Sequence, residues 1–227
     1  MQLFSFIFSL FWEKKCYACG QVWHFFCPAC NNTLDIYKPY CYVCKEYSHS
    51  FNTHKKCSTY FPLKQVVVLT HYRQAWIKKL IRHAKYYNKY SSFEDLISQN
   101  KDFFSQYVDA KKTLFVPIPI HTVRKWKRWY NQSEKIAYYL SSILDIPVNI
   151  KIIYKKKYTK HQSHLSQNER RKNLQSSFWV RVNNLSKDTI IYLVDDVVST
   201  GSTLIEATKE LQKFWFTDIR AIVLASD

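Results

Sequence analysis

Residues 190–203 read IIYLVDDVVSTGST, which predicts a buried β-strand, a turn and the beginning of a helix. The apolar run from Ile190 to Val194 forms the strand, and two aspartates follow it directly. Backbone N–H groups of such a turn converge at a helix N-terminus, where the helix dipole is positive. The segment is therefore typical of a phosphate site, and the two carboxylates could hold the vicinal hydroxyls of a ribose. A simple capping turn explains two consecutive aspartates less well.

Glycine is scarce in this chain. It occurs twice in 227 residues, where average usage of about 7% would give about sixteen. Because glycine tolerates positive φ and close backbone approach, each one indicates a specialised backbone position. Gly201 lies in the phosphate loop, and Gly20 directly follows the pair Cys16-x-x-Cys19. The two glycines thus mark two candidate sites.

The charge balance indicates an anionic partner. The formal net charge is +17, and a surplus of this size attracts nucleic acid, phosphorylated ligands or acidic membranes. Codon bias is an alternative explanation, since Lys, Ile, Asn, Tyr and Phe are all abundant and all have AT-rich codons. Apolar residues make up 47% of the chain, which favours a folded core over disorder.

The sequence predicts a cytoplasmic protein without a membrane span. It holds no run of about twenty apolar residues. The apolar stretch 3–12 is too short to cross a bilayer, and it lacks the basic region and cleavage site of a signal peptide. Seven cysteines favour metal binding in a reducing compartment over disulfides.

Strand and helix patterns alternate through most of the chain. Residues 66–72 predict a strand, and 72–86 and 92–107 predict amphipathic helices. From residue 113 onward we expect strands at 114–118, 148–154, 178–182, 190–194 and 219–224, and helices at 131–144, 165–173 and 202–214. This alternation predicts an α/β fold with a parallel sheet flanked by helices. The predicted division is a cysteine-rich module, residues 1–60, and an α/β domain, residues 61–227.

The N-terminal module contains four pairs of candidate metal ligands, each with two residues between its members. Three are Cys-x-x-Cys, and the fourth is His-x-x-Cys. Eight ligands suffice for two tetrahedral Zn²⁺ ions with closed, structural coordination. The predicted ligands are Cys16, Cys19, Cys27, Cys30, Cys41, Cys44, His54 and Cys57. We expect the pairs to combine in sequence order, one or two ions being bound.

Alternatives for this module stay open. A crossed pairing is possible, His24 and His49 are rival ligands, and iron–sulfur or redox cysteines are a further interpretation. A region of about 45 residues is too small to fold by core burial alone, so metal binding supplies the missing free energy.

The acidic pair and the loop after it resemble the phosphoribosyl pyrophosphate (PRPP) signature of type I phosphoribosyltransferases. In that family the acidic pair holds the ribose hydroxyls and the loop holds the 5′-phosphate, with Mg²⁺ accompanying PRPP. The resemblance implies a catalytic role for Asp195 and Asp196. It implies PRPP binding by Asp195, Asp196, Val197, Val198, Ser199, Thr200, Gly201, Ser202 and Thr203.

Two further blocks are similar to the ComF family of competence proteins. Val116-Pro-Ile-Pro119 followed by Arg128-Trp-Tyr-Asn-Gln132 resembles that family's P-x-P … R-G-F-N-Q, and Gln162-Ser-His-Leu165 followed by Arg170-Arg-Lys-Asn173 resembles its Q-x-x-L … R-x-x-N. The cysteine module before a phosphoribosyltransferase-like domain is also the layout of that family. One departure is Trp129, which stands where the family usually has Gly. The resemblance implies a role in natural transformation, in which the protein handles incoming single-stranded DNA.

Basic residues of the second half are candidates for two roles. As an enzyme site, residues 120–128 form a pyrophosphate loop, and the predicted anion ligands are Arg124, Lys125, Arg128 and Arg170. As a DNA surface, basic and aromatic side chains bind backbone and bases; the predicted residues are Lys127, Lys155, Lys156, Lys157, Arg171 and Trp129. A solvated basic face is the simpler interpretation of the same residues.

Three functions follow from these patterns. We favour a competence protein that binds single-stranded DNA and PRPP, in contact with a helicase or other protein of the DNA-uptake machinery. The alternative is an active phosphoribosyltransferase that transfers ribose 5-phosphate to an unknown acceptor. A third is a protein–protein adaptor built on the zinc module. The sequence leaves open whether the protein is an enzyme.

Overall fold

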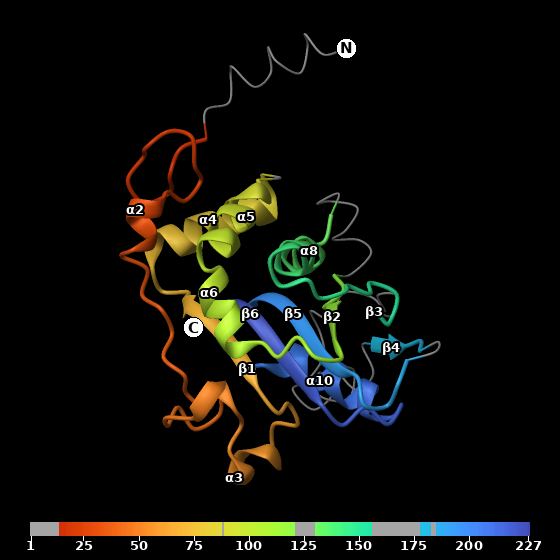
Figure 1. Ribbon diagram of the computed structural model, residues 1–227. Coiled ribbons are helices and arrows are strands. Elements are labelled where there is room, and N and C mark those ends of the chain that lie inside the picture. The colour runs from red at the N-terminus through yellow and green to blue at the C-terminus, as the bar shows by residue number, and fades with distance from the viewer. Residues whose placement is uncertain (1–13, 88, 121–129, 156–177, 183–184) are drawn as a thin grey trace, which may run out of the picture.

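A four-stranded parallel sheet forms the centre of the computed structural model (Figure 1). The structure describes residues 14–87, 89–120, 130–155, 178–182 and 185–227. Within these residues the strand order is β1-β6-β5-β2. The strands are β1 (Val66–His71), β2 (Thr113–Pro117), β5 (Ile190–Val198) and β6 (Ile219–Ser226). The predicted parallel sheet with flanking helices is confirmed.

The two inner strands are apolar along most of their length, as expected for a sheet covered on both faces. Strand β5 continues four residues beyond the predicted end at Val194. Its pairing with β2 stops at Pro117 opposite Val194, whereas its pairing with β6 runs on to Val198. The acidic pair therefore lies inside β5, at the point where the strand loses one neighbour.

Helices α8 (Gln132–Leu144) and α10 (Ser202–Gln212) lie on opposite sides of the sheet (Figure 1). The segment after α8 passes beside β2, where Val148 bridges Phe115, so this crossover moves away from β5. The crossover through α10 joins β5 to β6 in the other direction. Right-handed crossovers in opposite directions place their helices on opposite faces.

Three further helices follow β1 in the described part of the chain. They are α4 (Ala75–Tyr86), α5 (Ser91–Gln99) and α6 (Lys101–Tyr107). The single helix predicted at 92–107 is divided at Asn100, which has φ −113°. The side-chain amide of Asn100 donates to Asn31 Oδ1 and to the carbonyl of Leu96. The break between α5 and α6 thus coincides with a hydrogen bond to the cysteine-rich region, which the periodicity of the sequence does not reveal.

The strand predicted at 148–154 is shorter and differently paired. Strand β3 (Ile153–Lys155) pairs antiparallel with β4 (Phe178–Val180) in a separate two-stranded sheet. The helix predicted at 165–173 lies outside the described residues. No helix in the described part of the chain is long and apolar enough to cross a membrane.

The cysteine-rich region extends along the α/β domain. Its short helices α2 (Pro28–Asn31) and α3 (Lys55–Ser58) lie toward opposite ends of that domain, and η1 (His49–Phe51) lies between them in the sequence (Figure 1). Buried side chains such as Phe26 and Phe51 belong to the same hydrophobic cluster as the strands. The division at residue 60 stays a sequence prediction.

Asn131 joins β2 to α8. Its side-chain oxygen caps α8 by accepting from the backbone N–H of Ser133 at 3.2 Å. Its side-chain NH₂ group donates to the carbonyl of Ile118 at 2.9 Å. Asn131 is 1% exposed. The cap therefore fixes where α8 begins relative to the end of β2.

We expect Asn131→Ala to lower the free energy of unfolding by about 1–3 kcal/mol, because the helix cap is lost and a buried carbonyl loses its donor. Urea unfolding measures the change. The control is Asn149→Ala, which removes an exposed hydrogen bond to the Lys151 amide and is expected to cost under about 0.5 kcal/mol. Equal losses in the two variants would contradict this role for Asn131.

Candidate functional site

The turn between β5 and α10 has the geometry of an anion site. Ser199 and Thr200 are exposed at the end of β5, and Gly201 is the N-cap of α10 with φ +71°. Gly201 has no side chain to cap the helix, and its carbonyl accepts the first helical bond from Ile205. Amides of the first helical turn have no partner within the helix. They point toward the turn, where the helix dipole favours a negative charge.

The two carboxylates contact different helices. Asp195 Oδ1 accepts from Ser133 Oγ of α8 at 2.9 Å and from the Asp196 amide at 2.9 Å. Asp196 Oδ2 forms an ion pair with Lys85 Nζ of α4 at 2.9 Å, and Asp196 is 6% exposed. The neighbouring carboxylates are thus held by one hydroxyl, one amide and one ammonium.

Burial and then the charge of Asp196 raise the pKa of Asp195 to about 7. The Asp196 amide, Ser133 and Lys85 oppose this rise but only in part. A ligand that binds the ionised carboxylate, such as a cation or a pair of hydroxyl donors, would lower this pKa and displace the proton. Two adjacent carboxylate groups are also suitable oxygen ligands for Mg²⁺.

Some of the residues predicted to bind PRPP, anions or DNA lie within the described part of the chain, and the others lie outside it. The loop residues 195–203 lie together at the end of β5, and Lys155 lies on β3 with its ammonium 5.4 Å from the Phe178 ring centre. The other predicted basic and aromatic residues lie outside the described residues: Arg124, Lys125, Lys127, Arg128, Trp129, Lys156, Lys157, Arg170 and Arg171.

The structure contains a basic groove along α4 that the sequence pattern did not indicate as a site. It is a hollow of about 1140 Å³. The described residues that line it are Tyr72, Ala75, Lys78, Lys79, Arg82, His83, Lys85, Tyr86 and Tyr87. This described lining contains no acidic residue. Lys85 lines the groove and also forms the ion pair with Asp196, which is not itself part of the described lining. The spacing of Lys78, Arg82 and Lys85 places them on one helical face, which was the available signal.

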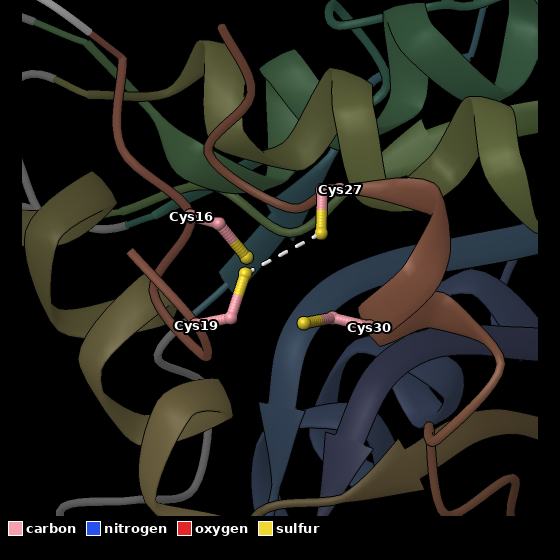
Figure 2. Close-up of side chains that lie close together, drawn as sticks. All are labelled: Cys16, Cys19, Cys27 and Cys30. Atoms are coloured by element: carbon pink, nitrogen blue, oxygen red, sulfur yellow. Dashed lines mark hydrogen bonds between the residues drawn. The ribbon is translucent and has the colours of Figure 1, made fainter. Parts of the chain in front are cut away.

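The eight predicted metal ligands form two groups of four. Cys16, Cys19, Cys27 and Cys30 make up the first centre, and Cys41, Cys44, His54 and Cys57 the second. Within each group all ligand atoms lie within 4.8 Å of one another. Figure 2 shows the four sulfur atoms of the first centre converging. The grouping follows sequence order, and His24 and His49 are in neither group.

The donor geometry fits Zn²⁺ at both centres. The Sγ atoms of Cys19 and Cys27 are 3.7 Å apart, near the roughly 3.8 Å between sulfurs of a tetrahedral site with Zn–S bonds of about 2.3 Å. In the second centre Cys44 Sγ lies 3.2 Å from His54 Nδ1. His54 Nε2 lies 3.1 Å from the carbonyl of Tyr47, which can accept a hydrogen bond from Nε2–H and so leave Nδ1 unprotonated for a metal. The two clusters could therefore hold zinc.

Backbone groups support the thiolates that a metal requires. Burial raises the pKa of Cys16, but hydrogen bonds from the backbone of Cys19, Cys27 and Ala18 outweigh it, and the pKa is lowered to about 7. Gly20 closes this turn at φ +81° by donating to the carbonyl of Cys16 at 2.9 Å. Lys45 closes the corresponding turn of Cys41 and Cys44 at φ +59°. The two turns thus share one local design.

Comparisons with known proteins identify the fold and then the family. A family model described as a phosphoribosyl transferase domain matches residues 131–227, which include α8, β5 and α10. The α/β domain is thus phosphoribosyltransferase-like. Competence protein F of Haemophilus influenzae is 31% identical over 211 residues, 88% of this chain and 84% of that protein. The chain belongs to the ComF family of competence proteins.

More distant relatives match a shorter part. The DNA utilization proteins YhgH of Salmonella typhi and of Escherichia coli K12 are 33% and 32% identical over 96 residues, 42% of this chain and 41% of each relative. Among solved structures, a purine phosphoribosyltransferase from Pyrococcus horikoshii aligns with a TM-score of 0.34 at 20% identity, over 71% of this chain and 78% of that one. This structural similarity is too low to support an argument about the site.

The raised pKa of Asp195 predicts a pH-dependent stability. An unfolded aspartate has a pKa of about 3.9, so between that pH and about 7 the folded protein binds one more proton than the unfolded chain. Stability contributed by protonated Asp195 is therefore lost as the pH rises toward 7. Asp195→Asn cannot ionise. We expect its melting temperature, relative to the unmodified protein, to rise between pH 6 and pH 8 by about 2–8 °C.

The control is Asp188→Asn. Hydrogen bonds from Lys112 and Ser186 lower the pKa of this exposed carboxyl to about 2, so its titration lies below the tested range. Differential scanning fluorimetry should give a constant offset for this variant between pH 6 and pH 8. The same pH slope in both variants would show that Asp195 does not titrate as described.

Proposed function

We propose that this protein binds incoming single-stranded DNA in the cytoplasm during natural transformation and carries a PRPP–Mg²⁺ site at the turn between β5 and α10. The similarity to Competence protein F and to the DNA utilization proteins supports a competence-related role. The observation that carries the DNA part of the proposal is the basic groove on α4.

The groove combines the two kinds of group that bind single strands. Its ammonium and guanidinium groups attract phosphates, and tyrosine rings stack on bases without sequence preference. Tyr86 and Tyr87 are 65% and 60% exposed. The ammonium of Lys78 lies 5.7 Å from the Tyr72 ring centre, a cation–π contact within the groove. Burial, together with the charges of Lys79, Lys89 and Arg82, lowers the pKa of His83, so lysine and arginine supply the positive charge at neutral pH.

The turn after β5 supports the PRPP part of the proposal. Backbone amides at the start of α10 would hold the 5′-phosphate, and Asp195 and Asp196 would hold the ribose hydroxyls. Bound Mg²⁺ would neutralise the pyrophosphate charge. Lys85 connects the two sites, because it contacts Asp196 and lines the groove. Two structural Zn²⁺ ions would hold the N-terminal region in place.

An active phosphoribosyltransferase is the second candidate, favoured by the same carboxylate pair. In that case the ribose C1–pyrophosphate bond breaks and a bond from C1 to an acceptor forms. Release of pyrophosphate that depends on Asp195 and Asp196 would be the signature. The protein partner that we propose is a helicase or another protein of the DNA-uptake machinery. If the protein were only a protein–protein adaptor, it would bind neither single-stranded DNA nor PRPP.

Fluorescence anisotropy of a labelled 20-nucleotide oligothymidylate, with and without PRPP–Mg²⁺, tests the proposal. If about four phosphates are contacted, affinity should fall about 50-fold between roughly 50 and 200 mM salt. Lys78→Ala with Arg82→Ala should weaken binding and reduce the salt slope by about 1.4.

The control removes two charges elsewhere. Lys209 and Lys213 lie at the C-terminal end of α10, and their double alanine variant should bind DNA as the unmodified protein does. Absence of binding at low salt would overturn the DNA part of the proposal. Equal weakening by both double variants would reject the α4 groove as the binding surface.

A further inference from the structure

The second metal centre touches the phosphate loop. Tyr42 lies between the ligands Cys41 and Cys44, and its hydroxyl donates to the carbonyl of Ser199 at 2.6 Å. Tyr42 is 8% exposed. A side chain placed between two candidate metal ligands therefore holds Ser199, the first residue after β5, 157 positions away in the sequence.

Gly201 packs against the same region. A Cβ atom at this position would lie 2.8 Å from Phe61 Cε2 and 3.2 Å from Tyr42 Cε1. The two rings are in contact, with centroids 5.2 Å apart. Gly201 is therefore required for two reasons, its φ of +71° and the closeness of these rings.

Both rings are carried by segments that also carry ligands of the second centre. Phe61 follows Cys57 by one helical turn, and its amide donates to the carbonyl of Cys57 at 3.1 Å. The ammonium of Lys45, the residue after Cys44, lies 4.3 Å from the Tyr42 ring centre on the cysteine turn. The position of the ring pair is thus set by the backbone that carries the ligands of the second centre.

The first centre contacts a different element. The Phe25 amide donates to Asp95 of α5 at 2.7 Å, and the Gln99 side chain of α5 donates to the carbonyl of Phe26 at 2.6 Å. The chain therefore contains an internal control, a second cluster of the same chemistry that packs on α5.

We propose that Tyr42 and Phe61 are positioning residues for the phosphate loop, and that metal binding at Cys41, Cys44, His54 and Cys57 sets the affinity of this loop for a phosphate group. The proposal rests on the proposed zinc and PRPP sites. The metal holds the ring pair, the ring pair holds Ser199 and Gly201, and these residues determine where the amides of α10 point. By linkage, a phosphate ligand in the loop must raise the zinc affinity of the second centre by the same factor.

The first measurement needs no phosphate ligand. Hydrogen–deuterium exchange of the amides in residues 199–205 is followed in the zinc-loaded protein and in Tyr42→Phe, which removes one oxygen atom and leaves every metal ligand in place. Exchange should become faster in Tyr42→Phe and in Cys44→Ser. It should stay unchanged in Tyr37→Phe, whose hydroxyl accepts from Lys45, and in Cys27→Ser of the first centre.

The second measurement is calorimetric titration with PRPP–Mg²⁺. We expect Tyr42→Phe to bind about 3- to 10-fold more weakly, the effect of losing one hydrogen bond, and Tyr37→Phe to stay within about 2-fold. Competition with a chromogenic chelator should show tighter zinc binding at the second centre when PRPP–Mg²⁺ is present, by a factor in the range of about 5 to 150.

The outcomes separate this inference from the proposed function. Unchanged exchange at 199–205 in both Tyr42→Phe and Cys44→Ser would overturn the coupling. Faster exchange in these two variants, without PRPP binding by the unmodified protein, would support the coupling and overturn the PRPP site. A chelator competition that PRPP–Mg²⁺ leaves unchanged, in protein that binds PRPP, would contradict the coupling.

Discussion

Two neighbouring carboxylates, Asp195 and Asp196, are held out of full contact with water where β5 loses its pairing with β2, and the site is arranged around them. Burying two like charges is costly unless each has a partner. Ser133 and the Asp196 amide serve Asp195, and Lys85 serves Asp196. The two side-chain partners, Ser133 and Lys85, come from α8 and α4, so the packing of both helices is tied to one electrostatic requirement.

The cysteine-rich region also contacts the elements around this site. Its two ligand clusters lie at different places on the α/β domain, one against α5 and one against the phosphate loop. A segment of this size has little core of its own. We propose that metal ions would supply local rigidity, which single contacts such as that of Tyr42 with Ser199 would transmit to the loop.

The sequence predicted what short-range rules determine. The strand, turn and helix of residues 190–212 follow from local pattern, and the x2 spacing identified the four ligand pairs. The structure groups these pairs in the sequence order that we expected, although the spacing alone left a crossed arrangement open. The contacts between distant segments were not predictable. Helical spacing places Lys85 on a face of α4 but does not name Asp196 as its partner. The break at Asn100 involves Asn31, a residue 69 positions earlier.

We propose that the turn between β5 and α10 receives a phosphate while the carboxylate pair receives a ribose. A crystal structure of the zinc-loaded protein with PRPP and Mg²⁺ tests it most directly. We expect the 5′-phosphate on the backbone amides of residues 199–203 and the ribose hydroxyls on Asp195 and Asp196. PRPP bound at another place, with this turn empty at saturating ligand, would contradict it.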